Sequence, residues 1–178
     1  RQQEGDRHWP IFLKTVERLK QDNPNLQVMV GKAANVSFTP IPNTFKIEDN
    51  ARKAMVAGTA ALVSSGTATL ECAVEDTPMV VCYKLSGVSW WMANTMASVK
   101  YASMVNLIAD EIIVPEFLQQ DMTASNLVAA VLPLLDHKNN LRKKMLTGFE
   151  KVRRTLGMPG VYDRAAESIL SKTKVEHD

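Results

Sequence analysis

Stretches with helical periodicity alternate along this chain with short runs of apolar residues. The apolar runs that predict strands lie at 26–30, 44–47, 60–64 and 78–83. The stretches that predict helices lie at 9–19, 50–57, 67–74, 88–99, 123–135, 141–156 and 163–170. This alternation is typical of βαβ units, so the pattern predicts an α/β fold in which helices flank a parallel sheet.

Prolines and short apolar segments set the less regular parts of the pattern. We expect Pro10 in the first turn of its helix, and we expect Pro133 to kink or shorten the helix that Thr123 caps. Residues 104–108 and 112–114 are apolar but follow neither period, so we expect irregular structure there.

Composition and charge exclude several classes of protein. The 178 residues suit one domain of ordinary size, and the formal net charge of +2 comes without a basic stripe, which argues against nucleic-acid binding. No run of about 18 apolar residues predicts a membrane span. Cys72 and Cys82 have neither a CxxC spacing nor a histidine cluster, so we interpret them as reduced core thiols and expect no metal.

Candidate chemistry lies in the turn from the strand at 60–64 into the next helix. Ligands of open α/β sheets bind at the carboxyl ends of strands, where a helix start offers free N–H groups to a diphosphate. Gly66 would let the backbone approach a ligand, and Ser65, Thr67 and Thr69 can donate hydroxyl hydrogen bonds. Glu71, one turn further on, has a carboxylate suited to a ribose diol.

The same turn also has a purely structural interpretation. A carboxylate near a helix start stabilises the helix dipole without any ligand, and short Ser-Gly-Thr turns are common. The segment is neither a P-loop nor a GxGxxG fingerprint. His8, His137 and His177 have no carboxylate or nucleophile at a recognisable spacing, so they suggest no catalytic pair.

Three segments in order carry a family resemblance. They are ALVSSGTATLE at 61–71, PMVVCYK at 78–84 and YASMVNLIAD at 101–110, and the match continues through 114–120. Together they resemble lipid-A-disaccharide synthase, an inverting glycosyltransferase of the GT-B fold. The resemblance implies a Rossmann-like half that binds a UDP-sugar as substrate and needs no cofactor.

The family reaction moves 2,3-diacylglucosamine from UDP-2,3-diacylglucosamine to lipid X, which is 2,3-diacylglucosamine 1-phosphate. The products are lipid A disaccharide 1-phosphate and UDP. By resemblance, Arg1 and Glu4 match the end of a Gly-Ser-Arg-x-x-Glu motif, and Arg1 would stabilise the leaving UDP. The stretch 65–71 matches the nucleotide-binding turn, and Asn106 matches a donor-site asparagine.

The resemblance also sets expectations for the rest of the molecule. It implies a donor-binding domain at 1–136 and C-terminal helices at 137–178 that cross to the other half of the enzyme or exchange in a homodimer. The alternative is that these helices complete one face of the sheet. The general base is expected outside this chain, which starts inside a motif at Arg1 and would be inactive alone.

Location and competing functions follow from the same comparison. The resemblance implies a cytoplasmic enzyme at the inner face of the cytoplasmic membrane. The segment 32–48 is shorter than in the family, so no residue is assigned to uracil. Two alternatives stay open: another GT-B UDP-sugar transferase or epimerase, and a non-catalytic nucleotide-binding α/β domain.

Overall fold

The computed structural model describes residues 2–31, 36–37, 40–64, 66–84, 100–157 and 160–173. In chain order the elements are α1 (Gln2–Asp22), β1 (Met29–Gly31), β2 (Lys46–Glu48), α2 (Ala51–Ala57), β3 (Ala61–Ser64), α3 (Thr67–Val74), β4 (Met79–Tyr83), α5 (Met104–Ala109), β5 (Glu116–Leu118), α6 (Ala124–Leu135), α7 (Asn140–Leu156) and α8 (Val161–Thr173). The helix expected at 88–99 lies outside the described residues.

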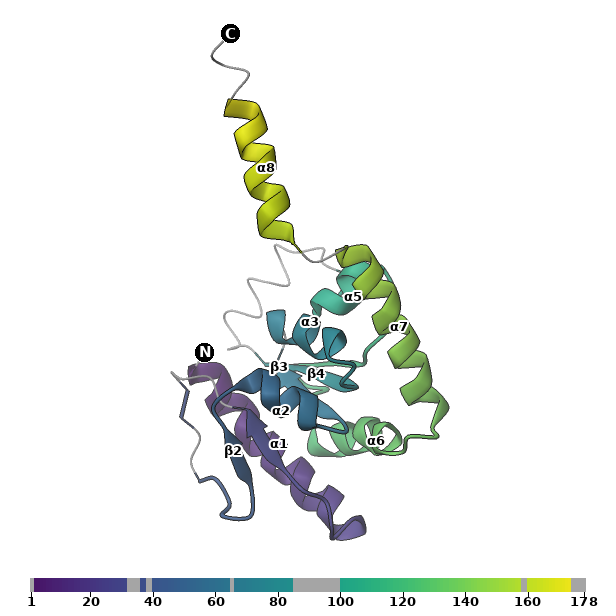
Figure 1. Ribbon diagram of the computed structural model, residues 1–178. Helices are drawn as coiled ribbons and strands as arrows, with labels where there is room; N and C mark the ends of the chain where they lie inside the picture. Colours follow the sequence, from purple (N-terminus) through teal and green to yellow (C-terminus); the bar gives the residue numbers. More distant parts are fainter. Residues whose placement is uncertain are drawn as a thin grey trace.

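The strands pair in parallel and are flanked by helices, as the alternating pattern predicted. β1 pairs with β2, and β4 lies between β3 and β5 in a second sheet. Helices α1 and α6 cover one face of the three-stranded sheet, while α3, α5 and α7 form the layer on the other face (Figure 1). The α/β prediction is therefore confirmed, and β4 is the centre of the core.

The core consists of β4 and the apolar faces of the helices around it. Residues 79–82 are fully buried, as the β-branched run at 78–83 predicted. Phe149 on α7 and Leu127 on α6 pack into the same cluster from opposite layers. Cys72 and Cys82 are both free and buried, and burial raises the pKa of each thiol, that of Cys72 to about 12.

Two helices differ from the predicted positions of their prolines. α1 begins at Gln2, so Pro10 lies inside the helix and the expectation of a first-turn proline was wrong. Its ring is exposed, whereas the preceding His8 and Trp9 are buried, and this burial stabilises the earlier turns. α6 continues past Pro133 to Leu135, so the helix is not shortened.

Residues 112–114 lie in neither a helix nor a strand, as expected, whereas residues 104–108 lie in α5, so the expectation of irregular structure there was wrong. Ser103 caps the start of α5, because its side chain accepts a hydrogen bond from the N–H of Asn106. β5 exists because it pairs with the exposed edge of β4, with Cys82 opposite Phe117. Its three residues are only half-buried, so neither alternation nor an apolar run could reveal this strand.

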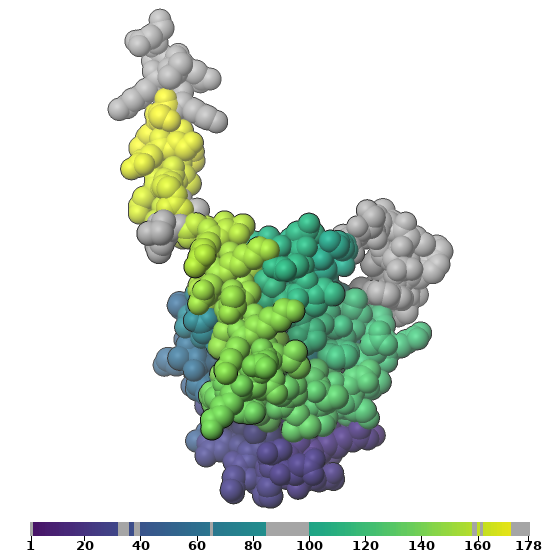
Figure 2. Space-filling model, turned by 90° about the vertical axis from the view of Figure 1, so that its right-hand side faces the viewer, coloured from purple at the N-terminus to yellow at the C-terminus, as the bar shows by residue number. Residues whose placement is uncertain are grey.

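The two C-terminal helices behave differently. α7 packs on α3 and α5 through Met145, Phe149 and Val152, and its buried Arg142 donates to the carbonyl oxygens of Thr59 and Leu134 at 2.5 and 2.7 Å. α8 stands away from the folded body (Figure 2), and its described side chains are exposed. Thus α7 completes the layer on this face of the sheet, and α8 takes no part in it.

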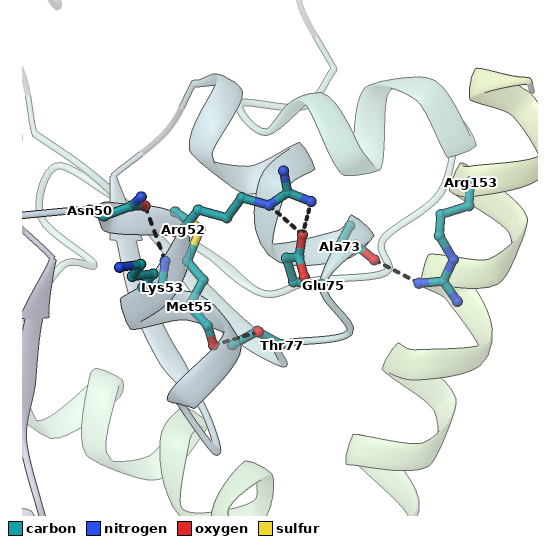
Figure 3. Close-up of polar contacts among 8 residues, drawn as sticks. All are labelled: Asn50, Arg52, Lys53, Met55, Ala73, Glu75, Thr77 and Arg153. Carbon is teal, nitrogen blue, oxygen red and sulfur yellow. Dashed lines mark hydrogen bonds and ion pairs between the residues drawn. The ribbon is translucent and has the colours of Figure 1, made fainter. Parts of the chain in front are cut away.

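Polar contacts fasten the amino edge of the three-stranded sheet, at the α3–β4 turn (Figure 3). Arg52 on α2 forms an ion pair with Glu75 at 2.6 Å, and the Thr77 hydroxyl donates to the Met55 carbonyl at 2.8 Å. Arg153 on α7 donates to the Ala73 carbonyl at 2.7 Å. These bonds rigidify the edge opposite the carboxyl ends of the strands.

Candidate functional site

The predicted strand–turn–helix lies at the carboxyl edge of the sheet. β3 ends at Ser64 and α3 starts at Thr67, while Ser65 lies outside the described residues. Gly66 has φ 135° and ψ −161°, a backbone conformation that side chains rarely adopt. Among the described residues, no atom lies within 4 Å of a Cβ placed there, and no side chain caps α3. No described side chain therefore obstructs the start of α3.

The side chains of this turn differ in what they can offer. Thr69 is fully buried, and its hydroxyl donates to the Gly66 carbonyl at 2.8 Å, so this hydroxyl shapes the turn. Thr67 and Glu71 are exposed on the first two turns of α3. These two side chains can contact a bound molecule without breaking a bond that the structure records.

Asn106 is fully buried, and its carboxamide holds the connection between α5 and β5. Its Nδ2 donates to the Val114 carbonyl at 2.9 Å and to Glu116 Oε1 at 2.8 Å. Its Oδ1 accepts from the N–H groups of Ile113 and Val114 at 2.8 and 3.0 Å. Two donors and two acceptor sites are the whole capacity of an amide side chain, so all of it is used within the chain.

Glu116 is a residue that sequence reasoning did not single out. Its carboxylate accepts from the N–H of Ala102 at 2.8 Å, and from the N–H and hydroxyl of Ser103 at 2.8 and 2.7 Å. With the bond from Asn106, it ties β5 to the start of α5. Only the matching segment 114–120 pointed to it, because these partners meet only when β5 pairs with β4.

His8 is a second residue whose partners the sequence concealed. Its side chain is buried, with Nδ1 2.8 Å from Ser64 Oγ, and Nε2 accepts from the N–H of Lys84 at 2.9 Å. Burial, and then the positive charges of Arg7 and Lys84, lower the pKa of His8 to about 4. The ring is therefore neutral near pH 7, and since Nε2 accepts a hydrogen bond, Nδ1 carries the proton.

Other groups gather at the same edge. α1 contacts β4, and burial and the nearby charge of Glu4 raise the pKa of Tyr83 at the end of that strand. Gln119 follows β5 with φ 48°, and its N–H donates to the Tyr83 carbonyl at 3.0 Å. Within the described ranges its Nε2 is buried without a hydrogen-bond partner. Arg1 lies outside the described residues.

Other kinds of site find little support in the described part of the chain. Two open surface hollows lie on the outer sides of α7 and α2, and neither includes a residue of the carboxyl edge. No group of three histidine, cysteine or acidic side chains is placed to hold a metal ion within the described ranges. None of the described helices combines the length and apolar character needed to cross a membrane.

A parallel sheet between helical layers, with an open helix start at its carboxyl edge, defines a Rossmann-like α/β domain of the kind that forms one half of a GT-B glycosyltransferase. The family model for lipid-A-disaccharide synthetase matches residues 1–169. The chain belongs to this family, which confirms the resemblance of its motifs.

Similar proteins extend this result. The chain is 34% identical over 169 residues to the lipid-A-disaccharide synthase of Myxococcus xanthus, an alignment that covers 90% of the chain and 44% of that relative. It is 45% identical over 116 residues to the synthase of Prochlorococcus marinus, an alignment that covers 64% of the chain and 29% of that relative. It is 31% identical over 186 residues to the synthase of Hahella chejuensis, an alignment that covers 98% of the chain and 47% of that relative. The chain thus spans less than half the length of these relatives.

Proposed function

We propose that this chain is the donor-nucleotide half of an inverting glycosyltransferase of lipid A biosynthesis. The complete enzyme would move 2,3-diacylglucosamine from UDP-2,3-diacylglucosamine to lipid X, giving lipid A disaccharide 1-phosphate and UDP. Family membership supports the reaction. The open start of α3 at Gly66 is the single observation that supports placing the nucleotide in this half.

In this proposal the diphosphate binds at the start of α3. Free N–H groups and the positive end of the helix dipole favour an anion there, and Gly66 lets the backbone approach it closely. Ser65 and Thr67 would donate hydroxyl hydrogen bonds to phosphate oxygens. The exposed Glu71 carboxylate would accept both hydroxyl hydrogens of the ribose.

Three further residues have indirect or charge-based roles. Thr69 and Asn106 would shape the pocket through the backbone, because their polar groups are already bonded within the chain. Arg1 would lie beside the diphosphate, where a guanidinium offsets the negative charge that develops on departing UDP. The general base that activates the lipid X hydroxyl would come from the other half of the enzyme.

The remaining expectations concern assembly and location. Residues 1–136 would form the donor domain, and 137–178 would include the segment that crosses to the other half or to a partner copy in a homodimer. Exposed apolar side chains of α8 support a contact for this helix: Tyr162, Ile169 and Leu170. The enzyme would act in the cytoplasm, bound peripherally to the inner face of the membrane where its lipid substrates reside.

Titration of UDP against the complete enzyme tests the nucleotide site. Glu71→Ala removes the proposed ribose contact and should weaken UDP binding about 10-fold or more, as expected for hydrogen bonds to a charged group. Glu150→Ala, an equal charge change on α7, should leave the affinity unchanged. Equal affinity for Glu71→Ala and wild type, or no binding at millimolar UDP, would contradict the assignment.

A further inference from the structure

One buried side chain joins three separate segments at the carboxyl edge. His8 belongs to α1, Ser64 is the last residue of β3, and Lys84 directly follows β4. Both ring nitrogens are used, Nδ1 with Ser64 Oγ at 2.8 Å and Nε2 with the N–H of Lys84 at 2.9 Å. A rigid ring with only 2% of its surface exposed therefore fixes the ends of two adjacent strands relative to the helix.

The ring itself is held in place by its own helix. Phe12 lies one turn further along α1, with its ring centroid 5.9 Å from that of His8. The donor at Lys84 is a backbone N–H, which cannot change its role, so the neutral ring must accept at Nε2 and donate from Nδ1. The hydrogen bond to Ser64 consequently has a fixed direction.

The turn after Ser64 has few other supports among the described residues. Gly66 has no side chain, and nothing in this part of the structure lies within 4 Å of where one would begin. Thr69 bonds the Gly66 carbonyl from the helix side. On the strand side, the bond from His8 to Ser64 is the contact that anchors the turn to α1.

We propose that His8 is a positioning residue of the donor site, which holds the end of β3 so that the N–H groups at the start of α3 face the nucleotide diphosphate. This inference rests on the proposed function, since it assumes that the turn binds the diphosphate. His8 itself does not touch the nucleotide. Its loss should weaken donor binding because a turn that samples several conformations must be ordered when the ligand binds.

Variants of the complete enzyme separate the two hydrogen bonds. His8→Leu removes both, and Ser64→Ala removes the partner next to the turn. His8→Asn places an amide nitrogen near the position of Nδ1, so it can still donate to Ser64, whereas His8→Gln places an oxygen near Nε2 and keeps only the bond from Lys84. The decisive measurements are the dissociation constant of UDP and the KM values for donor and acceptor.

We expect His8→Leu to raise the UDP dissociation constant and the donor KM about tenfold, a loss typical of misplaced binding groups, with the acceptor KM unchanged. Ser64→Ala should have a comparable effect, and the double variant should be no worse than His8→Leu, because both changes remove the same bond. His8→Asn should restore most of the affinity, and His8→Gln should restore less.

Leu19→Ala is the matched control, since Leu19 is buried near the other end of α1. It should lower stability without changing UDP affinity, and an equal loss of affinity would overturn the positioning role. Folded His8→Leu and Ser64→Ala variants with wild-type affinity would also overturn it. If His8→Leu does not fold, the UDP dissociation constants of Ser64→Ala and His8→Asn test the positioning role instead. Failure of wild type to bind UDP, by contrast, would refute the proposed function.

Discussion

Single residues at the carboxyl edge divide into those that shape the site and those that remain open to a ligand. Thr69, Asn106 and His8 are buried and have their polar atoms bonded within the chain. Thr67 and Glu71 are exposed on the start of α3. Burying a polar group without a partner costs free energy, so the protein bonds the buried groups itself and leaves the exposed ones available.

Gly66 carries a testable consequence at this scale. Gly66→Ala forces a side chain into φ 135° and should reduce the free energy of unfolding by about 1–2 kcal/mol. Gly157→Ala is a matched control. Gly157 also has a positive φ, 82°, and no described atom lies within 4 Å of where its Cβ would be. It caps the end of α7 and so lies outside the proposed site. Urea unfolding should show similar losses of unfolding free energy for the two variants. Titration with UDP should show a weaker affinity only for Gly66→Ala. Unchanged UDP affinity in that variant would argue against a close backbone approach.

Among the elements, α5 and β5 are too short to be stable alone. They form because β5 pairs with β4 and because the Asn106 amide and the Glu116 carboxylate bond the chain on both sides of their connection. This explains why residues 104–118 show no clear period. Their conformation depends on hydrogen bonds between positions seven to fourteen residues apart, which local patterning does not encode.

Removing the Asn106 amide should destabilise the domain strongly. Asn106→Leu removes the partner of three backbone groups, namely the Val114 carbonyl and the N–H groups of Ile113 and Val114, so we expect a loss of about 2–4 kcal/mol. Leu107→Ala changes the adjacent, half-exposed residue and should cost less than about 1 kcal/mol. Urea unfolding measures the free energy of unfolding of both variants. Equal losses would mean that the hydrogen bonds of the Asn106 amide add little to stability.

At the scale of the whole molecule, the helices after α6 serve two purposes. α7 closes the layer over α3 and α5, whereas α8 stands apart with Tyr162, Ile169 and Leu170 exposed (Figure 2). A helix that buries no apolar face adds little to the stability of the domain from which it extends. Its apolar side chains are therefore expected to be covered in the complete protein.

Truncation after Gly157 tests this division of roles. Without α8, the chain of residues 1–178 should keep its thermal midpoint within about 2 °C, because the described side chains of α8 are exposed. Phe149→Ala, a cavity in the fully buried centre of α7, should lower the midpoint by about 10 °C. A large drop on truncation would show that α8 packs on its own domain.

The sequence by itself determined the α/β alternation, the buried run of β4, the turn at Gly66 and the family. These features are local, because a period, a run of β-branched residues or a short motif is complete within a few neighbouring positions. Tertiary structure alone decided which polar groups meet. His8 finds Ser64 and Lys84 only after β3 and β4 pair under α1, and Asn106 meets Glu116 only after β5 joins the sheet. Hydrogen bonds depend on distance in space, and that distance follows from the pairing of strands that the linear pattern does not specify.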